Sequence, residues 1–185
     1  MWIVSCRPGH PAHVSAFPLL MTTFRVDAQE WRVVSPVKTF SDDWFRAEWR
    51  KLGFHCDRDD ETKQWNIVGS KAGLRSFVAE LRDYASDQEN DWVSCHRNLG
   101  PYDYLEIGTW GSAVIDDHWI AGTLSDMLGL AAHIGDWVDA SQVEASLSVR
   151  PFFSPGSAYD LCLRMEADEF DPSSLDTALL GTAGG

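Results

Sequence analysis

The chain has 185 residues, of which 44% are apolar and 23% charged, and its formal net charge is −13. This balance is typical of a soluble globular protein, and no apolar run approaches the roughly 18–20 residues that span a bilayer. Because the few basic residues are scattered, the composition excludes a cationic surface for nucleic acid or for an anionic membrane.

The N-terminal stretch has no pattern of regular structure. Residues 1–20 contain one charged residue, Arg7, and three prolines that break any helix. We expect this stretch to be disordered, or to precede a true start at Met21. The four cysteines, Cys6, Cys56, Cys95 and Cys162, are too dispersed for a disulfide framework. Reduced thiols in the cytoplasm are the simplest interpretation.

The first predicted helix runs from an N-cap at Ser41 to a C-terminal stop at Gly53. Within it Phe45, Trp49 and Leu52 share one face, which predicts a buried aromatic stripe. After this helix, residues 54–57 and 65–68 read as two strands of a hairpin joined by a polar turn.

Two later segments match each other at an offset of 53 residues. Residues 66–70 and 119–123 each contain a short apolar strand, a glycine and a hydroxyl N-cap that opens a helix. The apolar positions of the two helices keep this offset in all six pairs. These pairs are Leu74 and Met127, Phe77 and Leu130, Val78 and Ala131, Leu81 and Ile134, Tyr84 and Trp137, and Ala85 and Val138.

Each of these helices is followed by two strand candidates, at residues 91–96 and 101–107 in the first unit and at 144–149 and 158–164 in the second. The matched order predicts an α+β fold in which two tandem βαββ units form a mostly antiparallel sheet with the helices packed on one face. A further strand is expected at residues 113–115.

The predicted organisation has four parts. Residues 21–109 form a first lobe with the extra N-terminal helix, and residues 110–172 form the second βαββ lobe. Residues 1–20 precede the first lobe, and residues 173–185 are expected to be a flexible tail because they end in small residues and glycine.

The sequence gives only weak indications of a catalytic or metal-binding site. His55 next to Cys56 and Cys95 next to His96 suggest zinc, but neighbours on a strand point to opposite faces, and the usual C-x₂₋₄-C spacing is missing. No G-x-S-x-G elbow or phosphate loop occurs. We therefore expect no metal, no cofactor and no catalytic set. A hydrolase-like enzyme that uses His118 with a neighbouring carboxylate is the alternative.

The residues best suited to bind a partner lie in the connections. Acidic side chains cluster in the hairpin turn and in the link between the units, and Trp110 lies in that link between glycines. Exposed aromatic and acidic groups are typical of a surface that meets a basic protein. The predicted partner-binding residues are Asp57, Asp59, Asp60, Glu61, Trp110, Asp116 and Asp117.

Residues 69–77, 99–107, 117–123 and 168–172 resemble small uncharacterised bacterial proteins and, more distantly, immunity proteins of bacterial polymorphic-toxin systems. This resemblance implies a cytoplasmic, non-enzymatic protein that binds and neutralises a toxin domain. We expect the chain itself to be a monomer or a homodimer. A self-associating regulatory module, which pairs through an exposed sheet edge, is a further alternative.

Overall fold

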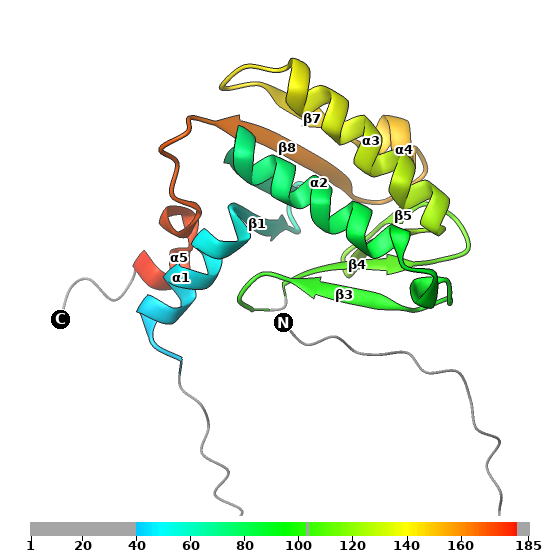
Figure 1. The fold of residues 1–185 in the computed structure, drawn as a ribbon, viewed down its shortest axis with the longest axis horizontal. Coiled ribbons are helices and arrows are strands. Elements are labelled where there is room, and N and C mark those ends of the chain that lie inside the picture. Colours follow the sequence, from blue (N-terminus) through cyan, green and yellow to red (C-terminus); the bar gives the residue numbers. More distant parts are fainter. Residues whose placement is uncertain (1–39, 103, 181–185) are drawn as a thin grey trace, which may run out of the picture.

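The computed structural model describes residues 40–102 and 104–180 (Figure 1). The expectations for residues 1–20 and 181–185 lie outside these ranges. The helices are α1 Asp42–Leu52, α2 Lys71–Ser86, α3 Leu124–Ala140, α4 Arg150–Phe153 and α5 Thr177–Leu180, with 3₁₀ turns η1 Gln88–Asn90 and η2 Pro172–Leu175. The strands are β1 Phe54–Asp59, β2 Gln64–Ser70, β3 His96–Leu99, β4 Leu105–Thr109, β5 Val114–Ile115, β6 Trp119–Gly122, β7 Ser146–Ser148 and β8 Asp160–Glu166.

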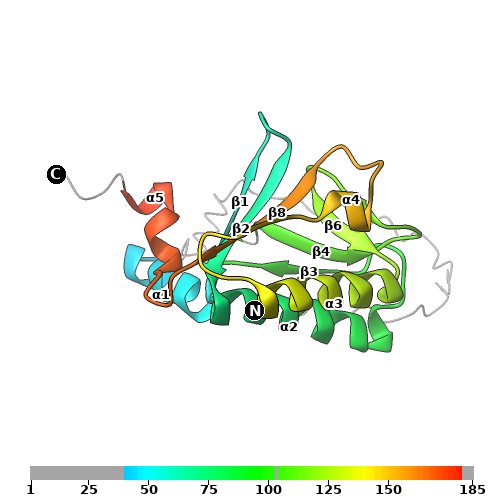
Figure 2. The same ribbon diagram turned by 90° about the horizontal axis from the view of Figure 1, so that it is seen from above.

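The predicted α+β class and its two βαββ-like units are confirmed, and the strands form two sheets. The strand orders are β1-β2-β8-β7 and β3-β4-β6-β5. In each sheet two antiparallel hairpins meet at one parallel pair, β2 with β8 and β4 with β6. Each sheet therefore takes one hairpin from each unit, so the two units share both sheets (Figure 2).

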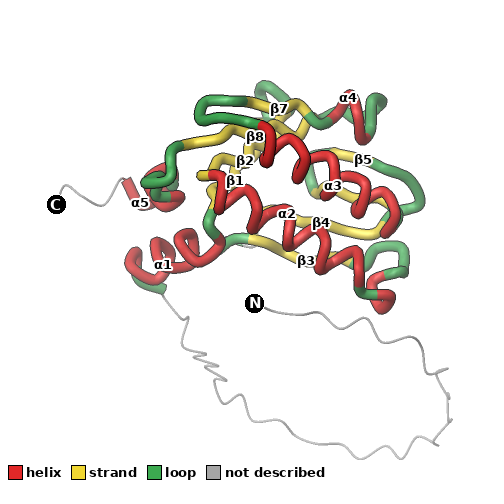
Figure 3. The backbone as a smooth tube through the Cα atoms, turned by 45° about the horizontal axis from the view of Figure 1, so that its top comes forward, coloured by secondary structure: helices red, strands yellow, loops and turns green. Residues whose placement is uncertain are grey.

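Helices α2 and α3 lie side by side on the same side of the sheets (Figure 3). Eleven of the twelve matched apolar positions are buried, and the twelfth, Trp137, is partly buried against the core. The core continues into both sheets through Ile67 and Ile107, which are fully buried. Burial of this apolar stripe is the main source of stability for helices of this length.

The starts of the two matched helices follow the predicted capping chemistry. The Ser70 hydroxyl accepts the Gly73 N–H at 3.3 Å, and the Thr123 hydroxyl accepts the Asp126 N–H at 3.1 Å. Asp126 returns the contact by accepting the Thr123 N–H at 2.9 Å, which completes a capping box. Gly73 is required for packing, since a Cβ there would lie 1.9 Å from the Gly53 carbonyl oxygen.

The hairpin, the first helix and the short strand of the link are found where the sequence predicts them. The strand expected at residues 91–96 begins only at His96, because η1 and a tight turn follow α2. The turn places Ser94 at a φ of 74°, which is incompatible with a regular strand.

The C-terminal segment differs from the expected flexible tail, because residues 173–180 form part of η2 and α5 against α1. Asp176, which is buried, accepts the Trp49 indole N–H at 2.7 Å and the Tyr102 hydroxyl at 2.8 Å. Arg50 of α1 also pairs with Asp171 at 2.6 Å. These long-range contacts fix the segment to the body of the fold.

Candidate acidic interaction surface

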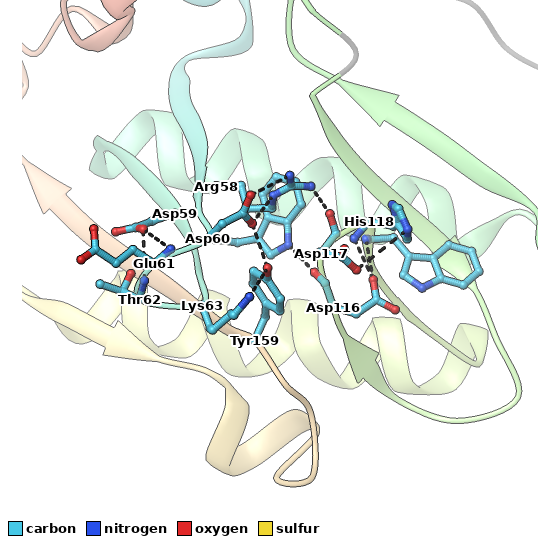
Figure 4. A network of polar contacts seen from close by, with 12 residues as sticks. Arg58, Asp59, Asp60, Glu61, Thr62, Lys63, Asp116, Asp117, His118 and Tyr159 are labelled. Carbon is cyan, nitrogen blue, oxygen red and sulfur yellow. Dashed lines mark hydrogen bonds and ion pairs between the residues drawn. The ribbon is translucent and has the colours of Figure 1, made fainter.

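The two acidic connections predicted to bind a partner lie next to each other in space (Figure 4). One is the β1–β2 turn with Asp59, Asp60 and Glu61, and the other is the β5–β6 turn with Asp116 and Asp117. Two side chains of the hairpin join these turns. Arg58 Nη1 donates to the Asp117 carbonyl oxygen, and Trp65 Nε1 donates to the Asp116 carbonyl oxygen at 2.7 Å. We call the five carboxylates of these turns the acidic surface.

One carboxylate in each turn holds the local backbone. Asp59 Oδ1 accepts the N–H groups of Glu61 at 2.8 Å and of Thr62 at 3.1 Å. Asp116 Oδ1 accepts the His118 N–H at 2.8 Å and one further N–H in the same turn. Such bonds from an aspartate to the following residues stabilise tight turns. Asp59 and Asp116 are accordingly half-buried.

The other three carboxylates, Asp60, Glu61 and Asp117, point to solvent. Asp60 accepts the Tyr159 hydroxyl at 2.8 Å and pairs with Arg58 Nε at 2.8 Å. The Tyr159 hydrogen bond, followed by Arg58, lowers the pKa of Asp60 below its usual value, so this carboxylate stays ionised. Lys63 donates to the Tyr159 hydroxyl at 3.2 Å. Among the described residues, Arg58 and Lys63 are therefore the two cations that accompany the five carboxylates, and the surface remains acidic.

Trp110 lies beside the end of β6 that is away from the acidic surface, where its N–H donates to the Gly122 carbonyl oxygen at 3.0 Å. Its ring lies 5.4 Å from that of Trp119, whose backbone N–H donates to Asp116 at 3.1 Å. Trp110 is 41% exposed. Two further exposed apolar residues, Trp92 and Val93, were missed because their segment reads as a strand. The bond from the Ser94 N–H to Thr109, at 2.9 Å, places this turn beside Trp110.

Asp57, the remaining predicted residue, does not join the acidic surface. It lies within β1 opposite Asn66, before the turn begins, and it lines a separate pocket with His55. Asp57 lies in the paired part of β1, two residues before Asp59, which ends the strand where the turn begins. Its position along the strand therefore keeps it out of the turn.

The residues considered for catalysis and metal binding lie apart. The side chain of His118 is 81% exposed, and its Nε2 is 3.9 Å from Asp117 Oδ1. Cys56 and Cys95 are buried, and burial raises the pKa of the Cys56 thiol. Within residues 40–102 and 104–180, histidine, cysteine and acidic side chains form no group of three or more suited to hold a metal ion.

In this same part of the chain, no helix combines the length and the apolar character needed to cross a membrane. No protein family, no curated protein and no solved structure matches the chain. A function is therefore inferred from the chemistry of its own residues.

Proposed function

We propose that this chain is a non-enzymatic, acidic protein-binding module, and that it acts in the bacterial cytoplasm as an immunity-type inhibitor of a basic toxin domain. The observation that supports this proposal is the joining of two acidic turns, distant in sequence, into one surface by Arg58 and Trp65. A toxin domain that acts on nucleic acid carries a cationic face, and this surface is complementary to such a face.

The acidic surface is held ready for a partner before binding. Asp59 and Asp116 fix the two turns, while Asp60, Glu61 and Asp117 remain exposed. A preformed surface loses less conformational entropy on binding than a mobile loop does. The net charge of −13 would also speed the encounter with a basic protein.

Charge alone gives fast association more than affinity, so an inhibitor also needs an apolar anchor. Trp110, with Trp92 and Val93 beside it, supplies exposed apolar area, and the Trp119 ring connects Trp110 to the acidic surface. Tryptophan is among the residues that most often dominate the energy of protein interfaces. We therefore assign Trp110 the role of anchor and the carboxylates the role of steering.

The proposal includes an internal duplication. It is supported by the matched N-caps Ser70 and Thr123 and by the common burial of the matched helix positions. Two copies of one unit are free to differ in their connections, and both acidic turns are connections.

The test is binding to the product of the gene adjacent to this one. Purified chain should bind that protein, and its co-expression should restore growth of cells that produce the protein alone. A double variant, Glu61→Gln with Asp117→Asn, should lower the association rate constant roughly tenfold at low ionic strength. The control double variant, Asp83→Asn with Asp136→Asn, removes the same charge from exposed positions on α2 and α3 and should have a much smaller effect.

Two results would contradict the proposal. One is continued killing by the neighbouring product in the presence of this chain. The other is an equal loss of association rate in the two double variants, which would mean that only the net charge matters.

A further inference from the structure

A pocket of about 340 Å³ lies where α1, β1, the residues before β4 and the C-terminal segment meet. Asp57 and His55 of β1 form one wall, and Leu175 closes the pocket from the C-terminal side. The same three residues also line a second hollow of about 360 Å³ on the face of the first sheet. The pocket is thus open on one side to the sheet surface.

Aromatic rings form much of the lining. Trp49 is buried, while Tyr102 and Tyr104 are 39% and 48% exposed and line the same pocket. The Tyr102 ring lies 6.3 Å from that of Trp49, and the Tyr104 ring lies 6.3 Å from that of Trp65, so neighbouring rings support both tyrosines. The faces of such rings attract organic cations.

The polar groups of the lining carry negative charge. Asp176 is held by its bonds from Trp49 and Tyr102, and burial beside this carboxylate raises the pKa of Tyr102 to about 12. Asp57 is half-buried, and its carboxylate makes no hydrogen bond or ion pair with any described residue. Among the described residues that line the pocket there is no lysine or arginine.

The His55 imidazole contacts the Trp49 ring at 4.7 Å but has an unused polar atom. His55 is only 6% exposed, and its Nδ1 has no hydrogen-bond partner within the described part of the chain. Burial lowers the pKa of His55 despite the nearby charges of Asp57 and Asp176, so the imidazole is neutral at pH 7. A buried polar group left unpaired is uncommon in folded proteins and costs stability.

We propose that this pocket binds an organic cation with N–H donors, a guanidinium or primary ammonium group, whose charge pairs with Asp57 and whose stem packs on Tyr102 and Tyr104. An anion would meet two carboxylates in the pocket, and Arg164 of the adjoining hollow is already paired with Glu166 at 2.9 Å. A neutral ligand would leave the charge of Asp57 unpaired in a partly desolvated site. The inference is independent of the proposed function, which rests on the acidic surface and Trp110.

The test is calorimetric titration of the full chain with two probes of the same shape. Nα-acetylarginine amide carries the cation, and Nα-acetylcitrulline amide replaces it by a neutral urea. The first should bind, and the second should bind at least about tenfold more weakly, because it lacks the charge that Asp57 recognises. An alanine-arginine-alanine peptide forms a third arm. Tighter binding of this peptide identifies a protein side chain as the source of the cation, and tighter binding of the amide identifies a small molecule.

Two variants locate the site. Asp57→Asn should raise the dissociation constant for the arginine probe about fivefold, the effect of one partly exposed ion pair. Tyr104→Leu keeps an apolar side chain but removes the ring and should raise it about threefold. The control Asp136→Asn, an exposed position on α3, should leave binding unchanged. Circular dichroism checks that each variant is folded. If Asp57→Asn does not fold, Tyr104→Leu, at a half-exposed position, still tests the site.

The proposal is overturned if the arginine and citrulline probes bind equally or if neither binds. It is also overturned if Asp57→Asn and Tyr104→Leu both bind the arginine probe as the Asp136→Asn control does.

Discussion

The contact of Asp176 with α1 predicts how strongly the C-terminal segment stabilises the fold. Asp176→Ala removes the acceptor of the buried Trp49 N–H, of the Tyr102 hydroxyl and of the Ala178 N–H. Leaving the indole donor unpaired costs about 1–3 kcal/mol. The Tyr102 hydroxyl can turn to water and adds about 0–1 kcal/mol. The free energy of unfolding should therefore fall by about 1–4 kcal/mol.

Urea denaturation followed by tryptophan fluorescence measures this change. Asp168→Ala, which removes an exposed carboxylate from the same segment, should change the free energy by less than about 0.5 kcal/mol. In a double-mutant cycle with Trp49→Phe, the two sites should show a coupling of at least about 1 kcal/mol. A coupling near zero, or a loss for Asp176→Ala no larger than that of Asp168→Ala, would refute the role assigned to this contact.

Three further outcomes follow from the helices and from the buried histidine. Thr123→Ala should lower the free energy of unfolding by about 1 kcal/mol, because it removes the capping box of α3; thermal and urea unfolding would check this. Gly73→Ala should destabilise the protein, since its Cβ would collide with a backbone oxygen. Gly129→Ala, in open space on α3, should stabilise it by about 0.5–1 kcal/mol. Changes of the same sign in the free energy of unfolding of the two variants would contradict this account. The pKa of His55 is lowered from 6.5 on folding, so the unfolded chain binds that proton first as the pH falls. Stability should therefore decrease below about pH 6.5, and His55→Gln should reduce this slope in unfolding measured across pH 4–7.

Local signals made much of the fold predictable. Ser41 and Gly53 mark the ends of α1 because capping depends on residues within one turn of the helix. The six matched helix positions identified the faces of α2 and α3 that meet in the core. The exchange of hairpins between the units was not predictable, because the parallel pairing of β2 with β8 joins residues about a hundred positions apart.

The candidate site was predictable in its residues and not in its assembly. Asp60 and Asp117 stand out in sequence as acids of solvated turns, but their proximity depends on Arg58, which looks unremarkable in sequence. Pairing with Asn66 keeps Asp57 within β1, two residues before the turn that it precedes in sequence. Asp176 was overlooked for a similar reason, since its partners Trp49 and Tyr102 lie more than seventy residues away.

The exchange of hairpins has a consequence for any isolated half of this polypeptide. The hairpin β1–β2 meets β7–β8, and β3–β4 meets β5–β6, so neither half contains both members of a parallel pair. A half made by itself would present unpaired strand edges and could complete its sheets only with a second molecule. Two identical halves, each lending a hairpin to the other about a twofold axis, would reproduce this architecture as a strand-swapped dimer.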